Sequence, residues 1–107
     1  MGYLNCSGTE YQFEDRLLAH LKSAIVKKLR KKESFLLSWT KEAEQGGGRV
    51  SVWLSPHSAL AFRFSGSRSP ALNKAWLNVL AAQANTPRGL VVLTEKEAET
   101  FAKQSRT

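Results

Sequence analysis

The chain has 107 residues, of which 42% are hydrophobic and 23% are charged, and its 16 Lys and Arg against 9 Asp and Glu give a formal net charge of +7. This length fits a single domain, 1–107, and the apolar content excludes a disordered basic tail. The single cysteine, Cys6, excludes an internal disulfide and a cysteine-rich zinc site, and it favours a reducing, cytoplasmic setting. No apolar run approaches the roughly 20 residues that cross a bilayer.

The first third of the chain predicts a β-hairpin followed by an amphipathic helix. Two short segments rich in Tyr, Leu and Phe, Met1–Leu4 and Thr9–Phe13, flank turn-forming residues at positions 5–8. Between Asp15 and Lys32 apolar residues recur at helical spacing, and basic residues gather where they suit the negative end of a helix. The apolar stripe consists of Leu17, Leu18, Leu21, Ile25 and Leu29. The opposite face, expected to be exposed, consists of Arg16, His20, Ser23, Lys27, Arg30 and Lys31.

The middle of the chain predicts three strands, because polarity alternates in Ser34–Thr40, Arg49–Ser55 and Ser58–Ser65. Lys41–Gly48 ends in three glycines and is expected to be a polar loop. In the second strand the residues that face one way are Val50, Val52 and Leu54, and those that face the other way are Arg49, Ser51 and Trp53. Because the links are short, we expect the three strands to form an antiparallel meander.

The last third predicts a second long helix, a strand and a short terminal helix. Ser69 suits the N-cap and Pro70 the first turn of a helix that runs to about Ala84. Its predicted apolar face consists of Leu72, Trp76, Val79 and Leu80. Leu90–Leu93 reads as a central strand, and Thr94 with Glu97 forms a capping box for the last helix. The predicted order, ββαβββαβ, is typical of an α+β fold with a mostly antiparallel sheet and two main helices on one face.

The distribution of charge is the main functional signal. Arg16–Lys32 contains seven basic residues and no acid, and Gln45–Thr94 contains five basic residues and no acid. A surface built from such segments carries a field of one sign, which attracts polyanions such as nucleic acid. The residues expected to contact phosphates are Lys27, Lys28, Arg30, Lys31, Arg49, Arg63, Arg68 and Lys74. The alternative is a solvated basic surface that serves solubility alone.

An open sheet face forms a second candidate. Alternation places Trp53 and Arg63 on the side of the sheet away from the helices, together with Ala59 and Ala61. An aromatic ring beside an arginine can stack on an unpaired base, so Trp53 joins the candidate nucleic-acid-binding residues. The alternative is that Trp53 lies under a loop or at a dimer seam, in which case the protein is an interaction module, a homodimer or an adaptor for an acidic protein.

Three other features are weaker candidates. The Ser65–Ser69 loop precedes the predicted second helix, so its amides and Arg68 are candidates to hold a phosphate, the alternative being an ordinary capped turn. Of the two histidines, His20 is expected to be an exposed helix residue and His57 a turn residue, and neither has metal-ligand spacing or a marked nucleophile beside it. We therefore predict no catalytic residue, no metal and no cofactor.

Five segments give the chain a family resemblance. They are Met1–Leu4, Phe13–Arg16, Leu18–Lys22, Glu33–Trp39 and Phe62–Arg68. With them the chain resembles a family of short actinobacterial proteins of unknown function, also expected in phages, that automatic labelling often calls ATP-dependent DNA ligase. The resemblance extends from Met1 to about Leu93 and implies no mechanism.

The ligase label can be tested on the residues. A nucleotidyl-transferring ligase needs a lysine in a Lys-x-Asp-Gly arrangement, but the only aspartate here, Asp15, is followed by Arg16 and Leu17. Phosphoryl transfer also needs carboxylates for magnesium, and the long Gln45–Thr94 segment contains none. The sequence therefore predicts a non-enzymatic protein that binds nucleic acid with low sequence specificity, and the label favours DNA as the ligand.

Overall fold

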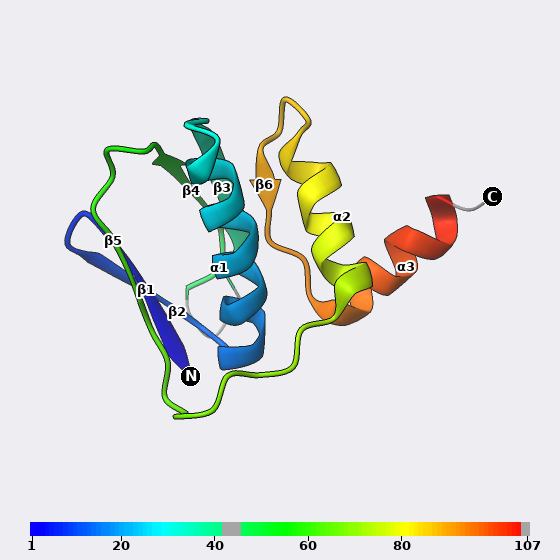
Figure 1. Cartoon of the computed structure of the whole chain (residues 1–107), viewed down its shortest axis with the longest axis horizontal. Coiled ribbons are helices and arrows are strands. Elements are labelled where there is room, and N and C mark those ends of the chain that lie inside the picture. The colour runs from blue at the N-terminus through cyan, green and yellow to red at the C-terminus, as the bar shows by residue number, and fades with distance from the viewer. Residues whose placement is uncertain (42–45, 106–107) are drawn as a thin grey trace.

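Strands and helices follow one another in the predicted order, with the terminal helix added (Figure 1). The computed structural model describes residues 1–41 and 46–105, so residues 42–45 of the loop predicted at Lys41–Gly48 lie outside the described residues. The strands are β1 (Gly2–Cys6), β2 (Thr9–Phe13), β3 (Phe35–Thr40), β4 (Arg49–Leu54), β5 (Leu60–Arg63) and β6 (Leu90–Val91). The helices are α1 (Asp15–Arg30), α2 (Lys74–Ala84) and α3 (Glu95–Ser105). The predicted α+β class is confirmed.

The described strands form two small sheets, where the sequence predicted one. The first has the order β2-β1-β5 and the second the order β4-β3-β6, and only the β3–β6 pair is parallel. The predicted meander is wrong, because β5 leaves β4 and pairs with the free edge of β1, where Phe62 lies opposite Leu4. This pairing adds Leu60 and Phe62 to the apolar side of the first sheet. Alternation alone could not reveal this exchange of partners.

The strand predicted at Leu90–Leu93 is shorter than expected and lies at a sheet edge, not in the centre. Among the described strands β6 pairs only with β3, and Leu37 lies opposite Leu90. The chain reaches this edge through Gly89, which has φ +75° and would bring a Cβ against the backbone of Leu36. Only glycine tolerates both the left-handed conformation and the close approach.

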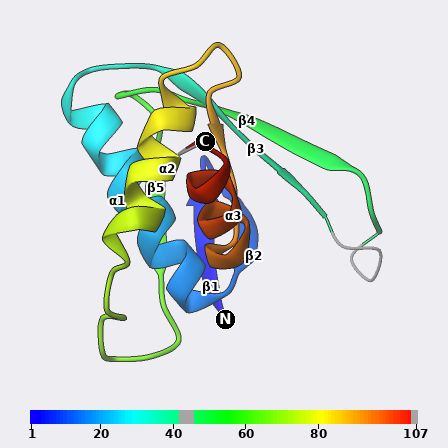
Figure 2. The ribbon, with the colours of Figure 1, turned by 90° about the vertical axis from the view of Figure 1, so that its right-hand side faces the viewer.

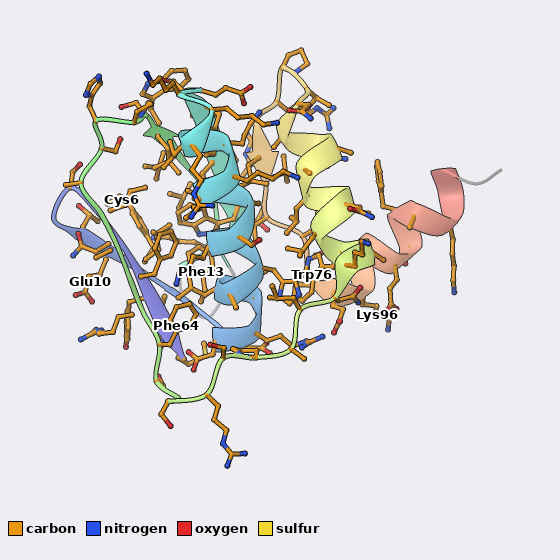
Figure 3. All side chains as sticks on the ribbon, in the orientation of Figure 1. Cys6, Glu10, Phe13, Phe64, Trp76 and Lys96 are labelled. Atoms are coloured by element: carbon orange, nitrogen blue, oxygen red, sulfur yellow. The ribbon has the colours of Figure 1, made fainter. Side chains whose placement is uncertain are left out.

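Helix α1 occupies the centre of the molecule, between the first sheet and α2 (Figures 1 and 2). In its predicted apolar stripe, Leu18, Leu21 and Ile25 are fully shielded from water, and Leu17 and Leu29 are partly buried. Trp76 of α2 lies on the other side of α1, where its ring stacks on His20 (Figure 3). None of the described helices is long and apolar enough to cross a membrane.

N-caps were predicted for two of the helices, and one of these predictions is correct. At α3 the capping box forms, because the Thr94 amide donates to the Glu97 carboxylate and the Glu97 amide donates to the Thr94 hydroxyl. At α2 the prediction is wrong, because Asn73, not Ser69, caps the helix by accepting from the amides of Ala75 and Trp76. Leu72 therefore precedes α2 and is 52% exposed, instead of lying on its apolar face.

Candidate nucleic-acid interface

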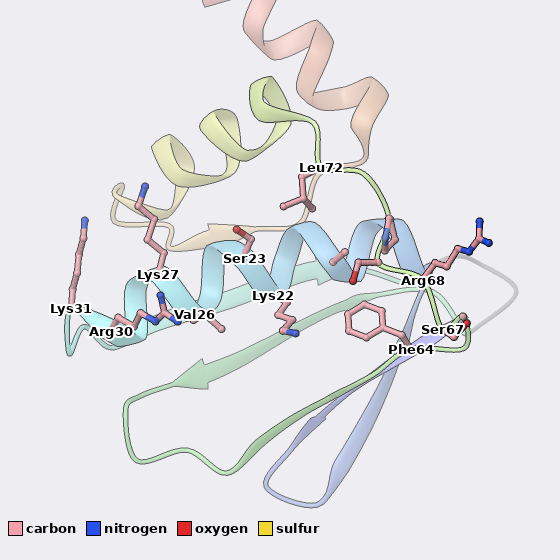
Figure 4. Close-up of a pocket in the computed structure, with 14 residues that line it drawn as sticks. Lys22, Ser23, Val26, Lys27, Arg30, Lys31, Phe64, Ser67, Arg68 and Leu72 are labelled. Carbon is pink, nitrogen blue, oxygen red and sulfur yellow. The ribbon is translucent and has the colours of Figure 1, made fainter.

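An open groove of about 850 Å³ lies between α1 and residues 64–72, which we call the wall segment (Figure 4). Helix α1 forms one side of the groove and the wall segment forms the other. The basic side chains that line the groove are Lys22, Lys27, Arg30, Lys31 and Arg68. No described residue in the lining is acidic. Positive charge from two separate parts of the chain therefore gathers around one hollow.

The same groove also has an apolar surface. Phe64, Val26 and the exposed side chain of Leu72 contribute to its lining. The Lys22 ammonium lies 5.7 Å from the centre of the Phe64 ring, and Figure 4 shows the two side chains next to each other. Lys27, and Lys31 at the C-cap of α1, extend from the edge of the helix opposite to Lys22. The groove therefore presents both cations and an aromatic ring to a ligand.

The groove cations form no salt bridge with any other described residue. Among residues 1–41 and 46–105, the ion pairs join Met1 to Asp15, Arg16 to Glu95, Lys28 to Glu33 and Arg63 to Glu10. None of these pairs uses a basic residue of the groove. Charges that are not neutralised within the protein remain available to an external anion.

Of the predicted binding residues, Lys28 is placed away from the groove. Its side chain is only 14% exposed and pairs with Glu33 at 3.0 Å. It also donates to the Ala84 carbonyl and to the side-chain oxygen of Asn85, both at 3.0 Å. Lys28 therefore links the C-terminal end of α1 to the C-terminal end of α2.

The predicted sheet face shared by Trp53 and Arg63 does not form, because the two residues belong to different sheets. Arg63 lies on the outer side of the first sheet. Its guanidinium carbon is 4.5 Å from the centre of the Tyr3 ring, and its Nη2 is 3.2 Å from the Glu10 carboxylate. Trp53 lies on the second sheet, where it is 63% exposed and on the same face as Arg49. Neither residue lines the groove, and neither does Lys74.

The loop predicted to hold a phosphate already binds a carboxylate of the protein. The amide of Ser65 donates to Asp15 at 3.1 Å and the amide of Gly66 donates to it at 3.0 Å. These hydrogen bonds, that of Gly66 foremost, lower the pKa of the Asp15 carboxyl below its usual value. Because α2 begins only at Lys74, the loop is not at a helix N-terminus either. The Ser65–Ser69 phosphate site is therefore corrected to an internal anchor for Asp15.

The next residue of α1, Arg16, holds the other end of the wall segment. Its guanidinium donates to the Ala71 carbonyl at 2.6 Å and binds Glu95 through two nitrogens, at 2.7 and 3.3 Å. Asn73 also donates to Glu95, at 2.8 Å. The hydrogen bond from Arg16, followed by that from Asn73, lowers the pKa of Glu95 to about 2. Consecutive residues of α1 thus fix both ends of the wall of the groove.

His20 is fully buried, contrary to the prediction that it is exposed. Its Nδ1 lies 2.7 Å from the Arg16 carbonyl, and its Nε2 accepts from the Asn73 amide at 2.8 Å. A neutral ring with the proton on Nδ1 satisfies both contacts, so His20 supports the turn before α2. His57 lies in a turn, as predicted, and is exposed. No group of three or more His, Cys, Asp and Glu side chains able to hold a metal occurs among the described residues.

The groove contains residues that the sequence analysis did not select, chiefly Lys22, Val26 and Phe64. One part of this set has a sequence signal, since Lys22, Val26 and Arg30 are four residues apart and therefore share a side of the helix. Phe64 has no such signal, because its position depends on the path of the wall segment.

Comparison with known proteins identifies the family of the chain but supplies no function. No curated protein and no solved structure matches the chain. Residues 1–95, which include both walls of the groove, match a family that is described only as a domain of unknown function, DUF7882. The chain therefore belongs to the DUF7882 family.

Proposed function

We propose that this protein is a non-enzymatic nucleic-acid-binding protein of the cytoplasm, that DNA is its favoured ligand, and that the groove is its binding surface. The observation that carries the proposal is the group of five basic side chains around a groove whose described lining has no acid. The actinobacterial and phage setting implied by the resemblance is part of the same proposal.

Counterion release supports a polyanion as the ligand. Each phosphate that a Lys or Arg neutralises frees condensed cations, which makes binding favourable at low salt and weak at high salt. Three of the groove cations lie on α1 and a fourth, Lys31, caps its C-terminal end, so positive charge extends along the helix where a sugar-phosphate backbone can follow it. A ligand with a single negative charge would use only part of this set.

The chemistry of the lining supports low sequence specificity. Sequence is read by Asn, Gln, Asp and Glu side chains as well as by Arg and Lys, and the described lining contains none of the first four types. Contacts from flexible lysines to phosphates carry no sequence information. The expected behaviour is therefore similar affinity for DNA of different sequence.

Fluorescence anisotropy with a labelled oligonucleotide tests this function. If each of the five groove cations neutralises one phosphate, the logarithm of the association constant should fall with the logarithm of the salt concentration with a slope between about −3.5 and −4.5. Arg88→Gln is a control and should bind as the wild type does, because Arg88 is exposed in the α2–β6 connection and lies outside the groove. Absence of binding at about 50 mM salt, or binding that ignores salt, contradicts the proposal.

A second candidate function, a protein-interaction module or homodimer, is favoured by one observation. Trp53 is 63% exposed on β4, which is an edge strand of its sheet. An exposed edge with a large aromatic side chain can pair with a strand of another chain. Light scattering of the wild type and of Trp53→Ala tests this candidate. A protein that is monomeric with and without Trp53, and an acidic partner that is bound equally by both, would remove its basis.

A further inference from the structure

The apolar part of the groove suggests the form of the nucleic acid. We infer that the groove holds an unpaired nucleotide of a single strand, with the base against Phe64 and the adjacent phosphates on Lys22 and the basic residues of α1. This inference rests on the proposed function and narrows its ligand. The combination that carries it is an aromatic ring inside the groove and, around it, cations that form no salt bridge with a described residue.

The lining distinguishes a single strand from a duplex. The outside of a duplex offers phosphates and base edges, while the faces of its bases are covered by their neighbours in the stack. Phe64, Val26 and Leu72 would have no counterpart on such a surface. An unstacked base has an apolar face that an aromatic side chain can cover. A groove of about 850 Å³ is also within the range that holds a small-molecule-sized group.

Lys22 is placed to serve both parts of one nucleotide. Its ammonium lies 5.7 Å from the centre of the Phe64 ring and belongs to the same helix as Lys27 and Arg30. A phosphate attached to a base on Phe64 would therefore meet a cation directly beside the ring. The cations farther along α1 would hold the neighbouring phosphates.

The concave shape argues against an anionic membrane surface as the occupant. Segments that lie on membranes bury a protruding apolar face in the headgroup region. Phe64 instead lines a hollow and packs partly against the hydrophobic core. A flat bilayer cannot follow the groove to reach this ring, whereas an extended strand can place one base into it.

The test compares a labelled 12-nucleotide oligo-dT with a 12-base-pair duplex by anisotropy at equal salt. The wild type is expected to bind the single strand at least about 10-fold more tightly. Phe64→Leu keeps an apolar side chain but removes the ring, so it should weaken single-strand binding by about 5- to 150-fold. The salt slope and the affinity for the duplex should not change. Phe64→Tyr, which keeps the ring, should bind as the wild type does.

Trp53→Leu is the matched control, since it removes an exposed aromatic ring outside the groove. If Trp53→Leu weakens single-strand binding and Phe64→Leu does not, the inference is overturned. Equal binding of both DNA forms with no effect at Phe64 also overturns it. In both cases nucleic-acid binding itself remains, but in the first case its surface is the outer face of β4 and not the groove. Absence of binding to either form, with or without binding to phosphatidylglycerol vesicles, overturns the inference together with the proposed function.

A crosslinking measurement covers the case in which Phe64→Leu does not fold. An oligo-dT that carries 5-iododeoxyuridine is irradiated with the wild-type protein, and the crosslinked peptide is identified by mass spectrometry. A crosslink at Phe64 supports the inference. A crosslink confined to Trp53, or to residues outside the groove, overturns it.

Discussion

In the first turn of α1 the charged side chains are bound within the protein, whereas in the later turns most of them face the groove without a partner among the described residues. Asp15 and Arg16 hold the two ends of the wall segment and contact Glu95 and backbone groups. Lys27 and Arg30 line the groove and form no salt bridge in the described part of the chain. One helix therefore builds the groove with one end and supplies its charge with the other.

The difference shows that residue type alone does not reveal whether a basic side chain stabilises the fold or is available to a ligand. Arg16 and Arg30 are both arginines of one amphipathic helix. Arg16 donates a hydrogen bond to Glu95, which is 79 positions away in the sequence, and this contact gives Arg16 a structural role. Arg63 likewise meets Glu10, 53 positions away. Four variants test the division of α1 into a structural end and a proposed binding end.

The largest effect is expected from removing charge at the binding end. A triple variant, Lys27→Gln, Arg30→Gln and Lys31→Gln, removes the three phosphate contacts that we propose for these side chains and should bind DNA about 100-fold more weakly at 0.1 M salt. Its thermal stability should fall only slightly, because these side chains make no salt bridge to a described residue and each loses only a favourable interaction with the C-terminal end of α1, of about 0.3–1 kcal/mol. Anisotropy and thermal denaturation measure the two quantities. An unchanged affinity would show that the groove is not the binding surface.

A large effect on folding is expected at the structural end. His20→Phe keeps a ring next to Trp76 but leaves the Asn73 amide without its acceptor. A buried amide without a partner costs about 1–3 kcal/mol of the free energy of unfolding. Chemical denaturation measures this loss, and DNA affinity should remain at the wild-type value where the variant is folded. A variant as stable as the wild type would contradict the structural role of His20.

A pH-dependent effect is expected at Glu95. Its pKa of about 2 in the folded protein lies below its usual value of 4.5. The stabilisation is therefore complete above about pH 4.5 and is lost as the pH falls towards about 2. Asp15, whose pKa is also lowered, acts in the same direction. Thermal denaturation from about pH 7 to pH 2 should show this loss, and Glu95→Gln should be less stable at neutral pH with a flatter acid dependence. If the stability of Glu95→Gln changed with pH as that of the wild type does, the stabilising role of the Glu95 carboxylate would be contradicted.

The smallest effect is expected from Trp53→Ala. The side chain is 63% exposed and lies outside the groove, so the free energy of unfolding should change by no more than about 0.5 kcal/mol. DNA affinity should change by less than about twofold. Denaturation and anisotropy check the two expectations. A larger loss of affinity would move the binding surface from α1 to the outer face of β4.

Local features of the fold can be predicted from the sequence, and contacts between distant segments cannot. The capping box of Thr94 and Glu97 depends on residues three positions apart, and the alternation of β4 depends on neighbours. The pairing of β5 with β1 depends instead on a free strand edge far away in the sequence. Ser69 and Asn73 are both suitable caps, and the contacts of Asn73 with His20 and Glu95 select the second.

The candidate site follows the same division. The basic side of α1 can be predicted, because Lys27, Arg30 and Lys31 follow helical periodicity. The second wall cannot be predicted, since it requires the path of residues 64–72 and the two anchors at Asp15 and Arg16. For this reason the sequence selects Arg63, which pairs with Glu10, and does not select Phe64.

The two anchors of the wall segment have a consequence for how a ligand associates. Because adjacent residues at the start of α1 bind both ends of the wall segment, we expect the groove to keep its width before any ligand arrives. A preformed surface loses little conformational entropy on association, so encounter should proceed in one kinetic step at a rate governed by charge and ionic strength. Substitutions at Asp15 should then act at a distance, by widening the hollow and shortening the lifetime of the complex.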